Sequence, residues 1–297
     1  MSLVINHNLM AMNATRNLNA SYSNLAVSTR RLSSGLRVGT AADDAAGLAV
    51  RELMRADISS LNQGIRNAND AISMIQTADG ALSVIDEKLI RMKELATQAA
   101  TGTYNSDQRL IIDSEYQAMA SEITRIAKAT DFNGIYLLNG QLSGQNSDHD
   151  GTALSADGPL KVHFGTANDC SEDYYYVSIG TSTASALGVG LGATTSSGRT
   201  VSTQALAQQS LDALQDAIIS KDKIRANLGS LQNRLENTIT NLTIQAENVQ
   251  AAESQISDVD VAAEMTEFVR QQILTQSAVA MLAQANSLPR MALQLIG

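Results

Sequence analysis

The middle of the chain holds the only group of side chains that resembles a set of metal ligands. His149 lies between Asp148 and Asp150, and His163 and Cys170 follow further along. Histidine, cysteine and aspartate are the usual zinc ligands, but their spacing here matches no familiar zinc pattern. We therefore predict no metal site.

A glycine-rich segment, Gly188-Val189-Gly190-Leu191-Gly192, is the second candidate for chemistry. It lacks the Lys-Ser/Thr pair that follows in a phosphate-binding loop, and no clear strand and helix flank it. The three histidines are too scattered to suggest a histidine-based triad. The sequence predicts no enzyme active site and no cofactor.

Charge and composition exclude further classes. The net charge of −9 argues against nonspecific nucleic-acid binding, which needs a basic face. The C-terminal segment is too rich in Gln and Asn for a membrane span, so we expect no membrane insertion. The N-terminal segment lacks the basic and apolar stretches of a cleaved signal peptide, which predicts a cytoplasmic protein or export without cleavage.

Both ends of the chain are nearly uncharged. Apart from His7, Arg16 is the one charged residue in positions 1–29, and Arg290 is the one in positions 271–297. Chain ends are usually solvated and rich in charge. These ends are rich in Ala, Leu, Met and Gln at helical spacing, so we expect them to be buried against each other or against copies of the same molecule.

Long runs of apolar residues recur every seven positions or at alternating spacings of four and three. This periodicity predicts helices that pack as left-handed coiled coils. Because the chain has only two prolines, Pro159 and Pro289, little interrupts them. The fold class is therefore mainly α, a long coiled-coil-like helical rod formed by the N- and C-terminal segments. The rows are Leu18, Leu25 and Leu32; Leu61, Ala68, Ile75, Leu82, Leu89 and Ala96; Leu228, Leu235, Leu242, Val249 and Ile256; and Leu274, Ala278, Met281, Ala285, Leu288, Ala292 and Leu295.

The middle of the chain differs in composition. It is rich in Gly, Ser, Thr, Asn and Asp, and we expect two short strands at 161–165 and 174–179 in a small β-hairpin and loop region. The predicted organisation has three parts: a terminal helical inner domain (1–42 with 257–297), a helical rod domain (43–140 with 203–256) and a variable hairpin and loop region (141–202).

Several separate motifs occur in order along the chain. Those near the N-terminal end are Asn17-Leu18-Asn19, Arg31-Leu32-Ser33-Ser34-Gly35-Leu36-Arg37 and Asp43-Asp44-Ala45-Ala46-Gly47-Leu48-Ala49. Those further on are Asp131-Phe132-Asn133-Gly134, Gln272-Ile273-Leu274 and Ala280-Met281-Leu282-Ala283-Gln284-Ala285-Asn286. Over about 1–140 and 203–297 the sequence closely resembles bacterial flagellins, in a short form with a reduced central variable region.

The resemblance implies a structural subunit that polymerises into the flagellar filament used for motility. It implies secretion through the flagellar type III apparatus and an extracellular location in the filament. Expected partners are other flagellin subunits, an export chaperone at the C-terminal helix, and the hook-associated junction and cap proteins. The apolar residues expected to serve assembly and chaperone binding are Leu18, Leu25, Leu32, Leu274, Met281 and Leu288.

The resemblance also implies recognition of the monomer by the host toll-like receptor that senses flagellin. The matching residues are Arg91, Leu95 and Glu115, and the segment 91–98 carries Lys93 where the family pattern has Arg. Arg makes bidentate contacts that Lys does not. The alternative is that Arg91, Lys93 and Glu94 form a solvated helix face and that Leu95 packs against neighbouring subunits.

Because some flagellins are glycosylated in this region, the resemblance also implies an O-glycosylated surface on the hydroxyl residues of the middle region, with a plain flexible loop as the alternative. The candidates are Ser182, Thr183, Ser185, Thr194, Thr195, Ser196 and Ser197.

Three other functions compete with the filament subunit. The hook–filament junction protein shares the terminal architecture, but the dense motif matches favour the filament. A coiled-coil signalling or adaptor rod would leave the uncharged termini unexplained. An enzyme housed in the polar middle would need a convergent set of acid, base or metal ligands, which the sequence lacks.

Overall fold

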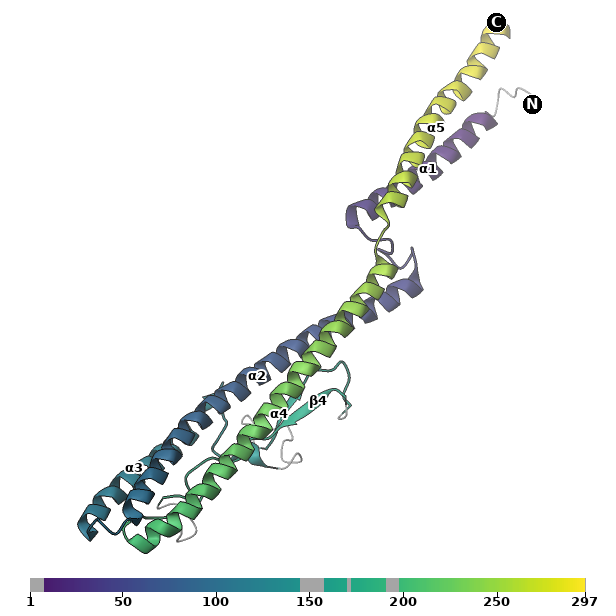
Figure 1. Cartoon of the computed structure of the whole chain (residues 1–297). Helices are drawn as coiled ribbons and strands as arrows, with labels where there is room; N and C mark the ends of the chain where they lie inside the picture. The colour runs from purple at the N-terminus through teal and green to yellow at the C-terminus, as the bar shows by residue number, and fades with distance from the viewer. Residues whose placement is uncertain (1–7, 145–157, 170–171, 191–197, 297) are drawn as a thin grey trace. The chain divides into compact units, whose positions relative to one another are not determined.

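The computed structural model describes residues 8–144, 158–169, 172–190 and 198–296, without the side chains of 288–290 and 292–296. Five helices occur in these residues: α1 (Leu9–Ser34), α2 (Ala45–Ala100), α3 (Ser106–Ala129), α4 (Gln204–Ser257) and α5 (Val261–Ile296) (Figure 1). They are joined by a short 3-10 helix η1 (Gln141–Ser143) and by four strands, β1 (Asp131–Phe132), β2 (Ile135–Tyr136), β3 (Leu160–His163) and β4 (Tyr174–Val177). The mainly α class is confirmed; the described residues contain two small antiparallel hairpins, β1–β2 and β3–β4, where the sequence predicted one.

The chain divides into two units. The terminal unit contains 1–58 and 247–297, and the central unit contains 59–246. The division into three domains stays a prediction.

In the terminal unit, α1 and α5 pair in antiparallel fashion. The start of α1 reaches α5 where Asn8 Nδ2 donates to the carbonyl of Ala285 at 2.8 Å, and its end reaches α5 where Arg31 lies 3.7 Å from Glu264. Two seams of four-three spacing face each other, which is the coiled-coil pattern. The covered positions are Ala14, Leu18, Ser21, Leu25, Ser28 and Leu32 on α1, and Glu264, Phe268, Gln271, Thr275, Ala278, Leu282 and Ala285 on α5.

Local capping explains where these helices begin and end. The side chain of Asn8 accepts a hydrogen bond from the amide of Ala11 and so caps α1, which stops at Gly35 with a φ of 74°. Asp260 accepts from the amides of Ala262 and Ala263 at the start of α5. Polar caps of this kind satisfy backbone donors that the first helical turn leaves free.

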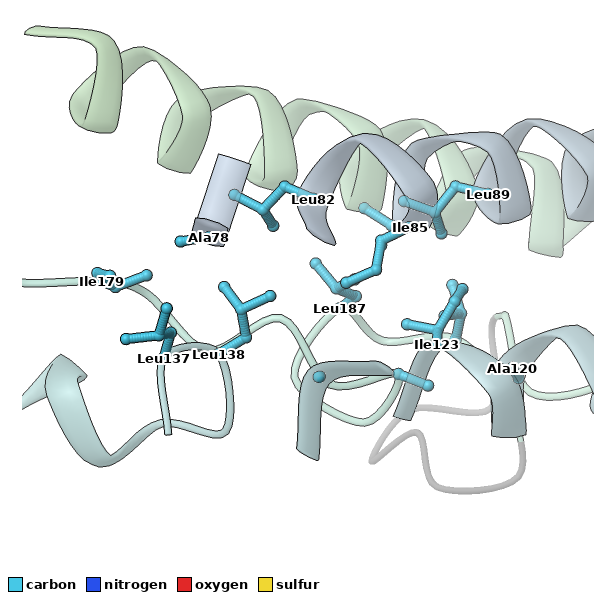
Figure 2. Close-up of a cluster of buried hydrophobic side chains, with 14 of the residues drawn as sticks. Ala78, Leu82, Ile85, Leu89, Ala120, Ile123, Leu137, Leu138, Ile179 and Leu187 are labelled. Atoms are coloured by element: carbon cyan, nitrogen blue, oxygen red, sulfur yellow. The ribbon is translucent and has the colours of Figure 1, made fainter. Parts of the chain in front are cut away.

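The central unit is built around a large apolar core, with a smaller buried cluster of Leu61, Phe164, Leu242 and Ala246 beside it. Figure 2 shows Leu82, Ile85 and Leu89 of α2 in one cluster with Ile123 of α3 and with Leu187 from the loop between β4 and α4. The predicted row on α2 is confirmed as core, because Leu61, Ala68, Ile75, Leu82, Leu89 and Ala96 are all buried.

The second hairpin packs onto the helices. β3 and β4 are antiparallel, with Lys161 opposite Tyr176, close to the predicted strand positions. Asn67 Nδ2 of α2 donates to the carbonyl of His163 at 2.8 Å, and the guanidinium of Arg234 on α4 lies 3.5 Å from the ring centre of Tyr175. These contacts tie the hairpin to both α2 and α4.

Candidate functional site

The α1–α5 pair leaves several large apolar side chains of α5 outside its own seam. Buried seam positions include Ser28, Gln271 and Thr275, whereas Leu274 is 46% exposed and Met281 is 59% exposed. Leu18, Leu25 and Leu32 are half-buried in the seam, and the side chain of Leu288 lies outside the described residues. The predicted row through Leu274 and Met281 does not coincide with the α1-facing seam: Ala278 and Ala285 of that row are covered by α1, whereas Leu274 and Met281 are not.

Apolar residues surround α5 on every side. Exposed examples beyond the seam are Met265, Val269, Ile273 and Val279. A helix that is apolar all round is normally buried, because no face of it is suited to water. Since α1 covers only one side of α5, the remaining sides form an apolar surface suited to binding a partner.

The two ends of the α1–α5 seam differ in their polar contacts. At one end, the hydrogen bond from Asn8 Nδ2 to the carbonyl of Ala285 is short. At the other end, Arg31 Nε and Glu264 Oε1 are buried without a hydrogen-bond partner in the described part of the chain. The same holds for the nearby Ser257 hydroxyl. Buried unsatisfied polar atoms weaken a contact. Backbone hydrogen bonds beside this end, from the amide of Arg37 to the carbonyl of Ser257 and from the amide of Val259 to the carbonyl of Gly35, hold the two chain segments together.

Two of the three receptor candidates meet on one surface. Arg91 of α2 donates from Nε and Nη2 to Glu115 Oε1 of α3 at 3.0 and 2.8 Å, and from Nη1 to Glu94 at 3.0 Å. Hydrogen bonds to Glu115 and then to Glu94 raise the pKa of Arg91. Both Arg91 and Glu115 remain partly exposed, so their charges are available to a partner.

The other side chains of this segment point elsewhere. Leu95 is only 2% exposed and belongs to the core of the central unit, so it does not share the surface of Arg91 and Glu115. Lys93 Nζ donates to Gln215 Oε1 of α4 at 2.5 Å. The sequence placed Arg91, Lys93 and Leu95 on one recognition segment. In the structure, Arg91 faces α3, Lys93 contacts α4 and Leu95 lies in the core.

The glycosylation candidates also separate. Ser182 is fully buried and Thr183 is 8% exposed, so the expectation of a glycan is corrected for these two positions, because a buried residue leaves no room for a sugar. Ser185 is exposed. The candidates at 194–197 lie outside the described residues, as do His149 and Cys170 of the ligand group.

Charged residues in the α2–α4 contact were missed by sequence reasoning. Lys221 of α4 is 2% exposed, and its Nζ lies 2.5 Å from Asp86 and 2.7 Å from Asp222. One turn on, Arg225 donates twice to Asp79, at 2.7 and 3.1 Å. The seven-residue spacing of the two α2 aspartates was the available signal, because it places both on one face of a coiled coil.

Within the described ranges, no group of three His, Cys, Asp or Glu side chains is arranged to hold a metal ion. None of the helices in those ranges is long and apolar enough to cross a membrane.

Comparison with known proteins identifies the family of the chain. The bacterial flagellin N-terminal helical region matches residues 5–143, and the bacterial flagellin C-terminal helical region matches residues 211–296. The chain is 40% identical over 302 residues to the flagellar filament 33 kDa core protein of Treponema phagedenis, covering 99% of this chain and 100% of that protein. It is also 40% identical over 294 residues to a flagellin of Halalkalibacterium halodurans, covering 99% of this chain and 100% of that protein.

Among solved structures, the crystal structure of Bacillus cereus flagellin aligns with 32% sequence identity and a TM-score of 0.44, over 63% of this chain and 94% of that chain. The two family regions and the full-length identities establish a structural protein of the flagellar filament rather than an enzyme. The chain belongs to the bacterial flagellin family.

Proposed function

We propose that this chain polymerises into the flagellar filament through its terminal helices. The observation that carries the proposal is the all-round apolar surface of α5, with Leu274 at 46% and Met281 at 59% exposure. Burial of such side chains stabilises a contact by roughly 25 cal/mol for each Å² removed from water. Copies of the same chain supply the matching apolar surface at high local concentration in a filament.

The test is elongation of sheared filament fragments by the purified chain, followed by negative-stain electron microscopy. The full chain is expected to extend the fragments. A Leu274→Asp, Met281→Asp double variant is expected not to extend them, since two buried carboxylates would be uncompensated. Circular dichroism would establish that this variant keeps its helices. Equal extension by both proteins would contradict the proposal.

A junction protein is the second candidate for this architecture. Such a protein would cap a hook rather than form long tubes. Fragments that never elongate with the unmodified chain would favour this alternative.

We further propose that an export chaperone binds α5 before polymerisation, with Leu274, Met281 and Leu288 as anchors. An apolar helix face laid into a groove is a recurrent mode of recognition. Loss of co-purification with the chaperone is expected for Leu274→Ala with Met281→Ala. The matched control is Met12→Ala, an equally exposed methionine on α1. An equal loss in the control would contradict the assignment to α5. Export in this mode needs no cleaved signal.

For the monomer, we propose that Arg91 and Glu115 form the charged part of a surface recognised by the flagellin-sensing toll-like receptor. Leu95 of the same helix then acts from within, because its burial in the core fixes α2 in place. Glu115→Ala is expected to weaken signalling in a receptor reporter assay. Glu122→Ala is the control, because it removes another acid of α3 that is paired with an arginine, Arg125. Equal signalling by both variants would contradict the role of Glu115.

Among the described glycosylation candidates, the proposal is restricted to Ser185, the exposed one. An intact mass equal to that of the polypeptide would show that the chain carries no glycan.

The inner, rod and variable domains proposed from sequence can be tested by limited proteolysis, with cuts expected near their predicted boundaries.

A further inference from the structure

The exposed methionines in the described part of the chain all lie on the two terminal helices. They are between 45% and 59% exposed, and they are Met10 and Met12 of α1 with Met265, Met281 and Met291 of α5. The helices α2 and α3 cover their own methionines: Met74 and Met92 are buried, and Met54 and Met119 are half-buried. Small solutes therefore reach thioether sulfurs chiefly on α1 and α5.

The exposed sulfurs are spread over the surface of the helix pair. Met10 and Met281 line a groove along one flank of the α1–α5 seam, and Met12 lines a groove along the other flank. At ~100° per residue, the three methionines of α5 point in successive directions roughly 80° apart around the helix axis. A chemical change at these sulfurs thus alters both flanks of the seam and more than one side of α5.

Methionine differs from the other apolar residues of this surface in its chemistry. Its unbranched side chain and polarisable sulfur suit an adaptable contact surface. Leucine has a similar volume and supplies comparable apolar area. Only methionine carries a thioether, which takes up an oxygen atom to become a polar sulfoxide and is returned to the thioether by dedicated reductases.

We propose that these five methionines form a redox switch, in which a peroxide converts them to methionine sulfoxide and thereby stops the chain from assembling. The proposal rests on the proposed function, since assembly is the activity that it regulates. In each step the thioether sulfur attacks one oxygen of hydrogen peroxide. An S–O bond forms and the O–O bond breaks, so the sulfur is oxidised by two electrons, and the second oxygen leaves as water with both protons.

The oxidised monomer is expected to stay folded. An exposed sulfoxide oxygen is hydrated by water, and Met74 and Met92 are out of reach in the folded central unit. The cost arises when another protein covers α1 and α5, because the sulfoxide oxygen then loses its water. Exposed neighbours on α5 such as Ile273 and Leu274 have apolar side chains that donate no hydrogen bond to it. The switch is therefore silent in the monomer and acts on assembly.

The first experiment identifies the sulfurs that react. All chains carry Cys170→Ser, which removes the one thiol of the sequence. The folded monomer is treated with hydrogen peroxide, and mass spectrometry of its peptides follows the gain of one oxygen at each methionine. Met265 and Met281 are expected to react about tenfold faster than Met74 and Met92, because susceptibility follows exposure. Equal rates at the exposed and the buried methionines would overturn the switch.

The second experiment measures the elongation of sheared filament fragments by treated and untreated chains. The treated chain is expected to elongate them at about a tenth of the untreated rate or less, with unchanged helical content by circular dichroism. Incubation with the two methionine sulfoxide reductases, one for each sulfoxide epimer, is expected to restore elongation. Normal elongation by the treated chain, or a loss that the reductases do not reverse, would overturn the switch.

Leucine variants assign the effect to the exposed sulfurs. The five-site variant is expected to elongate fragments both before and after peroxide, because leucine has no sulfur and a similar volume. The matched control is Met54→Leu with Met119→Leu, which changes half-buried methionines and is expected to lose elongation after peroxide as the unmodified chain does. The five-site variant carries Met10→Leu, Met12→Leu, Met265→Leu, Met281→Leu and Met291→Leu.

A five-site variant that peroxide inhibits as strongly as the unmodified chain would overturn the assignment, and so would a control that resists peroxide. If the five-site variant does not elongate fragments before treatment, the reductase rescue of the unmodified chain decides the question. Failure of the untreated, unmodified chain to elongate fragments would instead count against the proposed function, so the two failures are distinguishable.

Discussion

Lys221 Nζ lies 2.5 Å from Asp86 Oδ1, and this ammonium group is the most deeply buried charge in the contact between α2 and α4. Its second partner, Asp222, is 60% exposed and lies 2.7 Å away. A buried charge is tolerated only when it is paired, and removing one partner costs more than the pair contributes. Asp86 is thus the partner that keeps Lys221 inside the central unit.

We expect Asp86→Ala to lower the free energy of unfolding by about 2–3 kcal/mol, because it leaves Lys221 with one exposed partner. Replacing both partners together, as Asp86→Leu with Lys221→Met, is expected to change it by less than about 1 kcal/mol, since apolar side chains of similar size then replace the buried pair. Urea unfolding of the monomer measures both. Asp222→Ala is the control and should cost little; an Asp86→Ala protein as stable as the unmodified one would refute the pairing argument.

The close approach of β3 to α2 gives a second prediction. A Cβ atom at Gly64 would overlap the backbone oxygen of Phe164, which has no freedom to rotate away. Gly64→Ala is expected to displace the hairpin and lower the melting temperature. Gly80→Ala, on the same helix with nothing within 4 Å, is expected to raise stability by about 0.5–1 kcal/mol through helix propensity. If Gly64→Ala raises the melting temperature as Gly80→Ala does, the backbone of Phe164 does not lie against Gly64.

Tyr116 links stability to alkaline pH. Its hydroxyl donates to the carbonyl of Gly198 at 2.7 Å, and burial raises the pKa of Tyr116 above its ordinary value, with the charge of Asp113 adding to the rise. The unfolded chain therefore loses this proton first, at pH above ~10, and stability falls as pH rises further.

Tyr116→Phe is expected to cost about 1–2 kcal/mol at neutral pH, because a buried carbonyl loses its donor. The variant should also lose less stability than the unmodified chain when the pH rises above ~10. Thermal unfolding between neutral pH and pH about 11 measures both effects. If the stabilities of the two proteins fall equally as the pH rises, a group other than Tyr116 controls the loss of stability at alkaline pH.

Acid acts on the central unit through Asp79. The hydrogen bond from Arg225 lowers the pKa of Asp79, so the contribution of this pair is present above the unfolded value near ~3.9 and is lost as pH falls through the lower folded value. Since both side chains are partly exposed, Asp79→Asn is expected to cost less than about 1 kcal/mol at neutral pH. The difference between variant and unmodified protein should vanish at pH about 2. A difference that persists there would point to packing rather than charge.

Several elements were predictable because local rules decide them. The heptad row of Leu61 to Ala96 was assigned correctly to a core, because its apolar residues occupy one face and polar residues occupy the other. The helix start at Asn105 was predictable from the same kind of rule, since a capping box forms between Asn105 and Gln108. The motifs at both ends were sufficient to indicate the family.

The phase of the C-terminal seam was not predictable. Leu274 and Met281 have perfect four-three spacing, but so do Gln271 and Thr275 with their neighbours, and the latter set faces α1. When a helix is apolar all round, periodicity alone is satisfied by several faces. Only the presence of α1 decided which face was covered.

The helical periodicity, the caps, the uncharged ends and the family all follow from the order of the residues, because each depends on residues near one another in the chain or on motifs of fixed order. Tertiary packing settled which side chains are accessible. It buried Leu95, Ser182 and Lys221, and it paired Arg91 with Glu115 from another helix. The physical reason is that burial and ion pairing depend on which elements meet, and that depends on the packing of segments distant in the sequence.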